Sequence, residues 1–503
     1  MNIFTSRLQW LGLAIAVVAF AGTLPARTWK SKNSKYEVEA EFVQFKSGKV
    51  HLKKEDGEMV AVSMSALSSA DQKWVRDELQ RRKPVKTTPH KVRPVTPDAP
   101  KDAASNDWFQ WRGPNRDGKS AETGLLQSWE NNAPPLLWSA SGLGKGRSSV
   151  TVSGGRILTT GVKNGSGHLI ALKVEDGSLL WQTPIGGSSD VNCTPTVDNN
   201  HLVFAVSFDG DLVCAHVETG FELWRRSFSK DFGGKMMSQW GYAESPLVDG
   251  DRVICTPGGP SAMLAALDKR TGEDVWRTQM PNVGDRGKDG AGYSSIVISN
   301  AGGVKQYVQM VGRGLLGVAA DSGRMLWAYN KIANDTANIP TPVVSGEYVF
   351  CSTGYGTGAA LLKLRRGGRG VTANEVYFLP QNKLQNHHGG MIQLGEYLYC
   401  GHGHNNGFPV CIHLPNGRDA WRPGRGPGRR SAAVSYADGH LYFRYEDGTM
   451  ALIEATPKEF RLKGTFRIAT HHAESWPHPV IADGKLYLRD QDALHCYDIR
   501  SSR

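Results

Sequence analysis

The sequence is poor in charge, in cysteine and in long apolar runs, and each shortage excludes a class of protein. Charged residues are 21% of the chain, and Lys plus Arg exceed Asp plus Glu by only 59 to 48, which is not a nucleic-acid-binding composition. The seven cysteines are an odd number that fits no disulfide framework. Hydrophobic residues still make up 40%, so a large folded core is possible and disorder throughout is excluded.

The one long apolar run, residues 8–21, has the form of an export signal and is short for a membrane span. Arg7 precedes it, and small residues offer cleavage after Ala21 or after Ala26. We assign residues 1–26 to a signal peptide, and we expect a periplasmic or secreted protein with no transmembrane segment in the mature chain. The alternative is an anchor that stays attached.

A small module follows at residues 28–82. Residues 37–45 alternate at period two and return through 49–53 and 59–62, which predicts three antiparallel strands before a helical turn over 69–79. Residues 83–107 are rich in proline and predict an extended linker.

The small module resembles the SH3-like Sla-homology domain, a small β-barrel. The resemblance implies a module that binds proteins or peptides. The residues that carry it are Thr28-Trp29, Tyr36 to Phe45, Gly48 to Leu52, Leu67 and Ala70-Asp71-Gln72.

The rest of the chain repeats a turn in which Gly is followed four residues later by Trp. A second marker, a small or turn residue before an apolar pair, recurs roughly every 40–52 residues, which leaves room for four strands in each repeat. Eight such repeats over 108–503 predict an all-β, eight-bladed β-propeller. The turn occurs at Gly177/Trp181, Gly220/Trp224, Gly272/Trp276, Gly323/Trp327 and Gly417/Trp421, and the second marker at Ser149, Thr194, Ser245, Ser294, Thr341, Gly389, Ser431 and His478.

The eighth repeat ends at Cys496-Tyr497-Asp498, before a closing strand. An unassigned strand, Leu136-Leu137-Trp138, precedes the first blade. We predict that it completes blade eight and closes the ring, which removes two exposed sheet edges.

The repeats at Ala266 to Trp276 and the opening at Trp108 to Pro114 resemble the pyrroloquinoline-quinone-type (PQQ-type) repeat propellers. That family includes quinone-dependent dehydrogenases and cofactor-free scaffolds such as the propeller lipoprotein of the outer-membrane assembly machine. The resemblance implies an adjacent cysteine pair and a calcium site in the alcohol dehydrogenases, and no cysteine here has a cysteine neighbour. We therefore expect a non-enzymatic binding scaffold without a cofactor. A PQQ- and calcium-dependent alcohol or sugar dehydrogenase is the alternative.

Candidate site residues gather in the connections that open on one face of such a ring. Imidazole is a good metal ligand, but the histidine spacing is loose and no acidic residue repeats beside it, so we assign no metal and no catalytic residue. The aromatic residues and Glu244 either bind a ligand or pack the channel mouth. The candidates are His387, His388, His402, His404, His471 and His472, together with Trp240, Tyr242, Glu244 and Tyr293.

Two basic runs are expected to be flexible, glycine-containing loops on opposite faces. The second, with Arg422, Arg425, Arg429 and Arg430, should lie beside the histidines and dock an acidic protein or envelope polymer, unless it is only solvated surface. The first contains Lys363, Arg365, Arg366 and Arg369. The cysteines are expected to be buried free thiols, with Cys400–Cys411 as the one pairing considered.

Overall fold

The computed structural model describes most of the chain in two compact units, residues 1–91 and 92–503. The expected signal peptide, 1–26, and residues 83–106 of the expected linker lie outside the described residues. No helix of the described part has the length and apolar character needed to cross a membrane. The described residues are 27–33, 35–46, 48–81, 107–187, 190–199, 201–280, 282–368, 370–472 and 474–501.

The first unit is a four-stranded antiparallel sheet, ordered β1-β2-β3-β4, with one helix. The sequence predicted three of the strands; β1 is additional, and the helix is longer than the predicted turn. Trp29 of β1 packs edge-on against Trp74 of the helix, with ring centroids 5.2 Å apart. The elements are β1 (Arg27–Lys30), β2 (Glu37–Lys46), β3 (Lys49–Lys54), β4 (Met59–Ser63), the 3-10 turn η1 (Met64–Ala66) and α1 (Ser69–Arg81).

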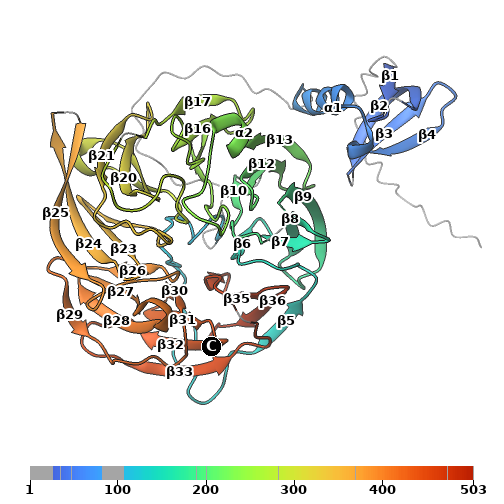
Figure 1. Ribbon diagram of the computed structural model, residues 1–503. Coiled ribbons are helices and arrows are strands. Elements are labelled where there is room, and N and C mark those ends of the chain that lie inside the picture. Colours follow the sequence, from blue (N-terminus) through green and yellow to red (C-terminus); the bar gives the residue numbers. More distant parts are fainter. Residues whose placement is uncertain are drawn as a thin grey trace, which may run out of the picture. The chain divides into compact units, whose positions relative to one another are not determined.

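The second unit is a closed ring of eight four-stranded antiparallel sheets, which confirms the predicted propeller (Figure 1). Blades one to four are β6 (Thr151–Ser153), β7 (Arg156–Lys163), β8 (Ser166–Lys173), β9 (Leu179–Gly186); β10 (Thr196–Asp198), β11 (Leu202–Val206), β12 (Asp211–His216), β13 (Glu222–Ser227); β14 (Leu247–Asp249), β15 (Arg252–Cys255), β16 (Ala265–Asp268), β17 (Asp274–Arg277); and β18 (Val297–Ser299), β19 (Gln306–Val311), β20 (Gly314–Ala319), β21 (Met325–Tyr329).

Blades five to eight complete the ring, and short helical segments lie in its connections. The strands are β22 (Val343–Ser345), β23 (Tyr348–Thr353), β24 (Gly358–Gly367), β25 (Gly370–Pro380); β26 (Met391–Leu394), β27 (Tyr397–His402), β28 (Phe408–His413), β29 (Arg418–Trp421); β30 (Ala432–Ala437), β31 (His440–Tyr445), β32 (Thr449–Glu454), β33 (Leu462–Arg467); and β34 (Val480–Ala482), β35 (Lys485–Asp490), β36 (Ala493–Asp498), β5 (Leu136–Ala140). The helical segments are α2 (Phe228–Phe232), η2 (Ala301–Gly303) and η3 (His404–Asn406).

The ring closes as predicted. Strand β5 pairs antiparallel with β36, with Trp138 opposite Cys496, so an early segment of the chain supplies the outer strand of the last blade. Because the ring closes, each blade packs against a neighbour on both of its faces.

The Gly–Trp turn is the joint between neighbouring blades. Gly220 adopts a left-handed φ of +68°, and a Cβ placed on it would lie 2.3 Å from the ring of Trp181 in the blade before. Trp181 Nε1 donates to the Val217 carbonyl, 3.1 Å away, beside that turn. In the fifth blade, where the Trp is missing, Tyr377 makes the equivalent contact by donating its hydroxyl to the Leu414 carbonyl at 2.5 Å. A ring side chain and a glycine therefore lock each such pair of blades together.

The seven cysteines are buried free thiols, as predicted. The Cys400–Cys411 pairing that we considered is wrong. Cys400 lies opposite Val410 in the β27–β28 ladder and Cys411 lies opposite Tyr399, so neighbouring positions send the two thiols to opposite faces of the blade. The Cys400 thiol and the Cys411 thiol belong to two different apolar clusters.

The first basic run forms strand rather than the predicted flexible loop. Arg365 and Arg366 pair with Thr372 and Val371 in the long β24–β25 hairpin. Lys363, in the same strand, lies over the ring of Tyr348. The β24–β25 hairpin extends past the position of the usual Gly–Trp turn, so the basic residues there are paired in strands. Arg369 lies outside the described residues.

The segment before β5 crosses the centre of the ring, and we call residues 108–120 the plug. The Trp108 amide donates to Val152 in blade one at 2.8 Å, and the Ser120 amide donates to Tyr436 in blade seven at 2.8 Å. Arg116 donates to the Ser245 carbonyl at 2.6 Å, and Arg112 donates to the Met391 carbonyl at 2.6 Å. These contacts with separate blades tie the plug to the ring from several sides.

Candidate binding site at the channel mouth

A cavity of about 360 Å³ lies at the face formed by the blade connections and the loops between second and third strands. A second cavity, of about 870 Å³, lies among the strand turns at residues 198–199 and 249–250, on the other face. Arg112 of the plug lines both, so the plug separates them. The first, which we call the mouth cavity, includes Trp111, Arg112, Arg147, Trp240, Tyr293, Tyr355, His387, His388, Arg430, Glu446, Glu474, Trp476 and His478 in its lining.

Several residues of the mouth cavity hold a left-handed backbone without being glycine. Arg112, Tyr355, Arg430 and Glu474 have φ between 55° and 64°. His404, which contacts Tyr355 with ring centroids 4.5 Å apart, has φ of 54°. Such residues cost about 1–3 kcal/mol each and collect at functional sites, because surrounding contacts must maintain them. Arg112, Arg116 and Asn199 line the second cavity in the same conformation, and the mouth cavity has the larger set, which marks it as a candidate site.

A relay of side chains fixes His387 in the cavity wall. Ser431 donates its hydroxyl to Asn405 Oδ1 at 3.0 Å, so His387 Nδ1 is the donor toward Ser431 Oγ at 2.6 Å. His387 Nε2 then accepts from the Tyr355 hydroxyl at 3.1 Å. Burial lowers the pKa of His387 to about 3, so its imidazole is neutral at neutral pH.

The floor of the cavity combines a buried cation with a buried neutral imidazole. Arg112 is 2% exposed and His478 is 4% exposed. His478 Nε2 donates to the His388 carbonyl at 3.1 Å, which leaves Nδ1 as an acceptor with no partner among the described residues. Burial lowers the pKa of His478 to about 3. Gly390 permits this approach, because a Cβ there would lie 2.7 Å from the His478 ring.

Arg112 has carbonyl partners and forms no ion pair with a carboxylate among the described residues, although the Asp117 charge acts on it. Its Nη2 donates to the Asp117 and Met391 carbonyls at 3.0 and 2.6 Å, and its buried Nε has no partner among the described residues. The Asp117 carboxylate instead pairs with Lys119 at 2.8 Å. Burial lowers the pKa of Arg112 to about 10, which still leaves the guanidinium charged at neutral pH.

Aromatic rings form much of the wall. Trp476 stacks on His388 with centroids 4.3 Å apart, and the Arg147 guanidinium lies 4.8 Å from the Trp476 ring. Trp240 is 41% exposed and meets Tyr293 edge-on at 6.0 Å. The exposed Trp240 ring gives the cavity an apolar surface at its rim.

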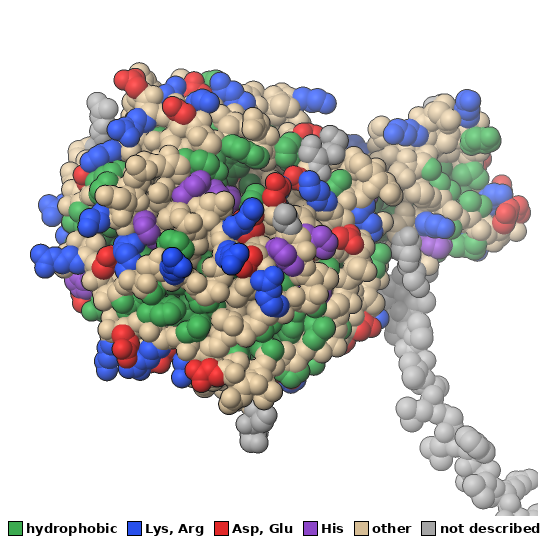
Figure 2. Space-filling model, turned by 60° about the horizontal axis from the view of Figure 1, so that its bottom comes forward, with side chains coloured by type: hydrophobic (Ala, Val, Ile, Leu, Met, Phe, Trp, Pro, Cys, Tyr) green, Lys and Arg blue, Asp and Glu red, His purple; other side chains and the backbone are tan. Residues whose placement is uncertain are grey.

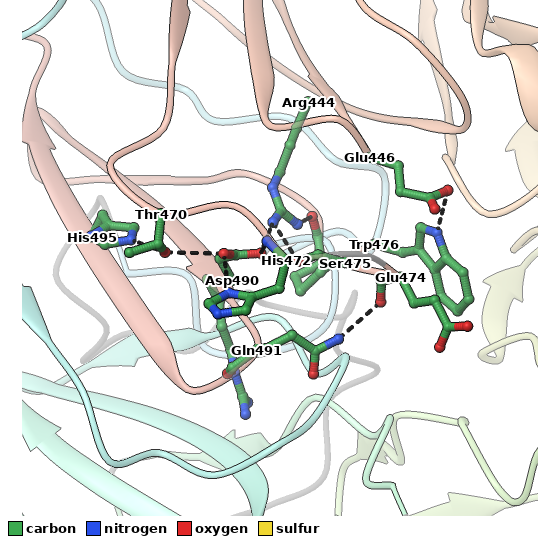
Figure 3. A network of polar contacts seen from close by, with 12 residues as sticks. Arg444, Glu446, Thr470, His472, Glu474, Ser475, Trp476, Asp490, Gln491 and His495 are labelled. Atoms are coloured by element: carbon green, nitrogen blue, oxygen red, sulfur yellow. Dashed lines mark hydrogen bonds and ion pairs between the residues drawn. The ribbon is translucent and has the colours of Figure 1, made fainter.

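A buried carboxylate positions the loop that carries Trp476 and Glu474 (Figure 3). Asp490 accepts from Thr470 Oγ1 at 3.0 Å and from His472 Nδ1 at 2.7 Å, and it forms an ion pair with Arg444 at 3.7 Å. Arg444 donates in turn to Ser475 Oγ at 2.7 Å. Trp476 Nε1 donates to Glu446 at 2.9 Å. The loop between blades seven and eight is therefore held at several points.

The sequence-predicted candidates divide between the cavity and its surroundings. Trp240, Tyr293, His387, His388 and Arg430 line it. His404 is outside the lining and contacts His387, with ring centroids 4.1 Å apart. His402 accepts from the Gln385 amide at 3.2 Å and does not line the cavity, and His471 is likewise outside the lining.

Tyr242 and Glu244 differ from the expectation that they share the channel mouth with Trp240. Tyr242 is buried and donates its hydroxyl to the Pro257 carbonyl at 2.8 Å. Glu244 is buried and accepts from the Thr256 amide and hydroxyl at 2.6 and 2.7 Å. Gly241, with φ of 68°, turns the chain between Trp240 and Tyr242, so the three side chains do not point the same way.

Of the second basic run, Arg430 lines the cavity, whereas Arg422, Arg425 and Arg429 do not. Arg422 pairs with Asp419 at 2.8 Å, and Arg430 pairs with Glu446 of the cavity wall at 3.2 Å. Arg425, Arg429 and Arg430 are exposed. On the face seen in Figure 2, basic and acidic side chains are interspersed, so the net charge of the chain does not form one uniform patch.

The sequence argument missed the residues that make the cavity floor and one wall. Arg112 lies in the Trp108–Pro114 opening that marked the family, and His478 lies in a repeat marker, so both stood at recognised positions without a predicted role. Trp476 and Tyr355 lie in irregular connections with no repeat that could identify them.

Comparison with known proteins follows the same division into two units. A family model described as outer membrane protein assembly factor BamB matches residues 122–213 and 195–423, and SLA1 homology domain 1 matches residues 21–83. The first match covers more than half of the chain. The chain belongs to the BamB family. It carries an SLA1 homology domain before its propeller.

Similar curated proteins are outer membrane protein assembly factors BamB. The one from Kangiella koreensis is 31% identical over 141 residues, which is 26% of this chain and 32% of that protein. The one from Burkholderia pseudomallei is 28% identical over 169 residues, which is 31% of this chain and 38% of that protein. The chain thus spans about a third of the length of these relatives.

Solved structures share the fold at low identity. BamB from Moraxella catarrhalis matches with a TM-score of 0.53 at 13% identity, covering 73% of this chain and all of that chain (100%). Quinohemoprotein alcohol dehydrogenase from Comamonas testosteroni matches with a TM-score of 0.55 at 12% identity, covering 80% and 82%. Because both scaffold and enzyme share this ring, the likeness shows the fold alone.

The quinone-dependent alcohol dehydrogenases that share this fold would need oxygen ligands for calcium and an adjacent cysteine pair. Among the described residues, no group of three or more His, Cys, Asp or Glu side chains is arranged to hold a metal ion. The mouth cavity carries two glutamates, and both are engaged, Glu446 with Arg430 and Glu474 with Arg147. No cysteine adjoins another in the chain.

Proposed function

We propose that this protein is a cell-envelope binding scaffold whose propeller docks an acidic partner, a protein or an envelope polymer, at the mouth cavity and the arginine loop beside it, residues 422–430. The observation that carries the proposal is the set of four non-glycine left-handed residues in the lining of the mouth cavity, Arg112, Tyr355, Arg430 and Glu474. Export rests on the apolar N-terminal run, and the BamB relatives support an envelope location.

Charge supports an acidic partner. Arg425 and Arg429 are exposed, and Arg430 reaches from the loop to the cavity wall. Arginine presents a planar fork that matches carboxylate and phosphate groups. The N-terminal unit adds a second module of the SLA1 homology type, for which we propose protein or peptide binding.

Capture from envelope extract tests the proposal. The full chain is immobilised beside a variant with Arg422, Arg425, Arg429 and Arg430 changed to Ser. A matched control carries Lys363→Ser, Arg365→Ser and Arg366→Ser in the β24–β25 hairpin. We expect the first variant to lose its principal partner at least tenfold, with capture by the parent weakening as salt rises, because exposed charges are screened over about 8 Å at physiological salt.

Two results would count against the scaffold. Equal partner sets for both variants at low salt would show that the arginine loop is only solvated surface. Turnover of an alcohol or aldose by the purified chain that requires added pyrroloquinoline quinone and Ca²⁺ would replace the scaffold with a dehydrogenase.

A further inference from the structure

Two of the three arginines that line the mouth cavity form ion pairs with carboxylates. Arg147 pairs with Glu474 and with Asp190, each at 2.6 Å, and Arg430 pairs with Glu446 at 3.2 Å. Arg112, the third arginine of the lining, forms no ion pair with a described carboxylate. A buried cation of this kind favours a ligand that brings a single negative charge.

The rest of the wall suits hydroxyl groups. The two Arg–Glu pairs place donors and acceptors side by side in the lining, and Asn192 and Asn405 add amide groups. A hydroxyl both donates and accepts, so it can satisfy such alternating groups. A flat aromatic acid would offer nothing to the two glutamates, and a second carboxylate inside the cavity would face their charge, so further residues of an acidic polysaccharide would lie outside it.

The third feature of the mouth cavity is an apolar surface at its rim. Trp240 exposes 41% of its surface at the rim beside Tyr293. The cavity volume, about 360 Å³, suits a ligand of one or two small rings. A saturated ring with hydroxyl groups around its edge, an apolar C–H face and one carboxylate matches all three features.

From this juxtaposition we propose that the mouth cavity binds a sugar acid of the hexuronate class, with its carboxylate toward Arg112, its hydroxyls toward the Arg–Glu pairs and its ring against Trp240. The inference rests on the proposed binding function and names its ligand chemistry. The sugar acid has two sources, a free monosaccharide or a residue of an acidic polysaccharide.

Titration of the purified full chain, followed by tryptophan fluorescence and calorimetry, tests the inference. The probes are D-glucuronate and D-galacturonate, their neutral counterparts D-glucose and D-galactose, the trimer of D-galacturonate, and benzoate. We expect at least one uronate to bind at least tenfold more tightly than its neutral counterpart and than benzoate. Tighter binding of the trimer assigns the source to a polysaccharide, and equal binding assigns it to the free sugar acid; either supports the proposal.

Variants separate ligand contact from folding. Arg112→Gln should reduce uronate affinity at least tenfold, but Arg112 also anchors the plug. Trp240→Ala therefore serves as a second variant at an exposed ring, and it should reduce affinity at least fivefold with an unchanged melting temperature. Arg366→Gln, in the distant β24–β25 hairpin, is the control and should change neither.

Three results would overturn the inference: no uronate binding, equal affinity for the uronate and its neutral sugar, or benzoate binding as tightly as the uronate. Normal capture of a partner from extract, with no uronate binding, would reject the sugar-acid ligand and leave the scaffold intact. Loss of both would reject the two proposals together.

Discussion

The two faces of the ring are closed by different kinds of turn. On the face opposite the mouth cavity, tight turns between paired strands use left-handed glycines, such as Gly220 and Gly250, or a short Asn or Asp, such as Asn199 and Asp438. On the cavity face, Tyr355, Arg430 and Glu474 adopt the same backbone region with long side chains, beside glycines such as Gly356. Glycine enters this region at little cost, whereas other residues are maintained there by their contacts. The first face joins blades, and the second presents side chains.

Opening the ring should have the largest effect on stability. Deleting residues 108–140 removes the plug and β5, so blade eight loses its outer strand and the channel loses the Arg112 and Arg116 contacts. We expect loss of the cooperative unfolding transition, measured by circular dichroism on heating. Deleting residues 27–81 is the control and should leave the propeller transition in place, because those residues belong to the other compact unit. A ring that melts normally without 108–140 would contradict the closure.

A single added methyl group tests the face opposite the mouth cavity, where the Gly–Trp turns join the blades. Gly220→Ala places a Cβ 2.3 Å from the Trp181 ring in a left-handed backbone. We expect a loss of about 2–4 kcal/mol in the free energy of unfolding, measured in urea. Gly250→Ala is the matched control, since Gly250 has φ of +61° but nothing within 4 Å of the added Cβ, and it should cost about 1 kcal/mol.

The opposite substitution tests the cavity face. Glu474→Gly removes a non-glycine residue with φ of 59° and an ion pair to Arg147 whose Glu474 side is 58% exposed. Relief of backbone strain and loss of an exposed pair nearly offset each other, so stability should change by less than about 1 kcal/mol. A loss as large as that of Gly220→Ala would show that the two faces do not differ in this way.

Acidification should weaken the cavity face through His478. The pKa of His478 in the folded chain is lowered to about 3, whereas an unfolded chain has a histidine pKa of about 6.5. The neutral form that folding requires is fully present above about 6.5, so this stability is lost as pH falls from there toward 3, by about 2 kcal/mol at pH 5. The stability difference between the parent and His478→Gln should therefore shrink from pH 7 to pH 5, measured by urea unfolding. Parallel curves would contradict the buried neutral state.

The ring could be predicted because its joints repeat. The Gly–Trp turn fixes both a chain reversal and a contact between blades, and the second marker, which recurs eight times, reports the blade count. The strand at 136–138 was then the missing outer strand of blade eight. Candidate residues such as His387 and Arg430 could be placed on the cavity face because the repeat locates the blade connections that carry them. Arg112 and Trp476 were not, because they meet across segments far apart in the chain and their convergence depends on the plug.

Tyr242 shows the local limit of that reasoning. Its place in the same blade connection as Trp240 predicted that both lie at the channel mouth, but a left-handed glycine lies between them and Tyr242 is buried in the core. The Cys400–Cys411 pairing failed on a similar point, since one step of strand register separates the two faces of a blade.

The plug divides the space at the centre of the ring into two cavities. Arg112 and Arg116 bond to carbonyls of separate blades, so the crossing segment is part of the folded ring. The mouth cavity and the larger cavity lie on either side of this segment, and Arg112 belongs to the lining of both. The ring therefore offers two separate places for a ligand, one at each face.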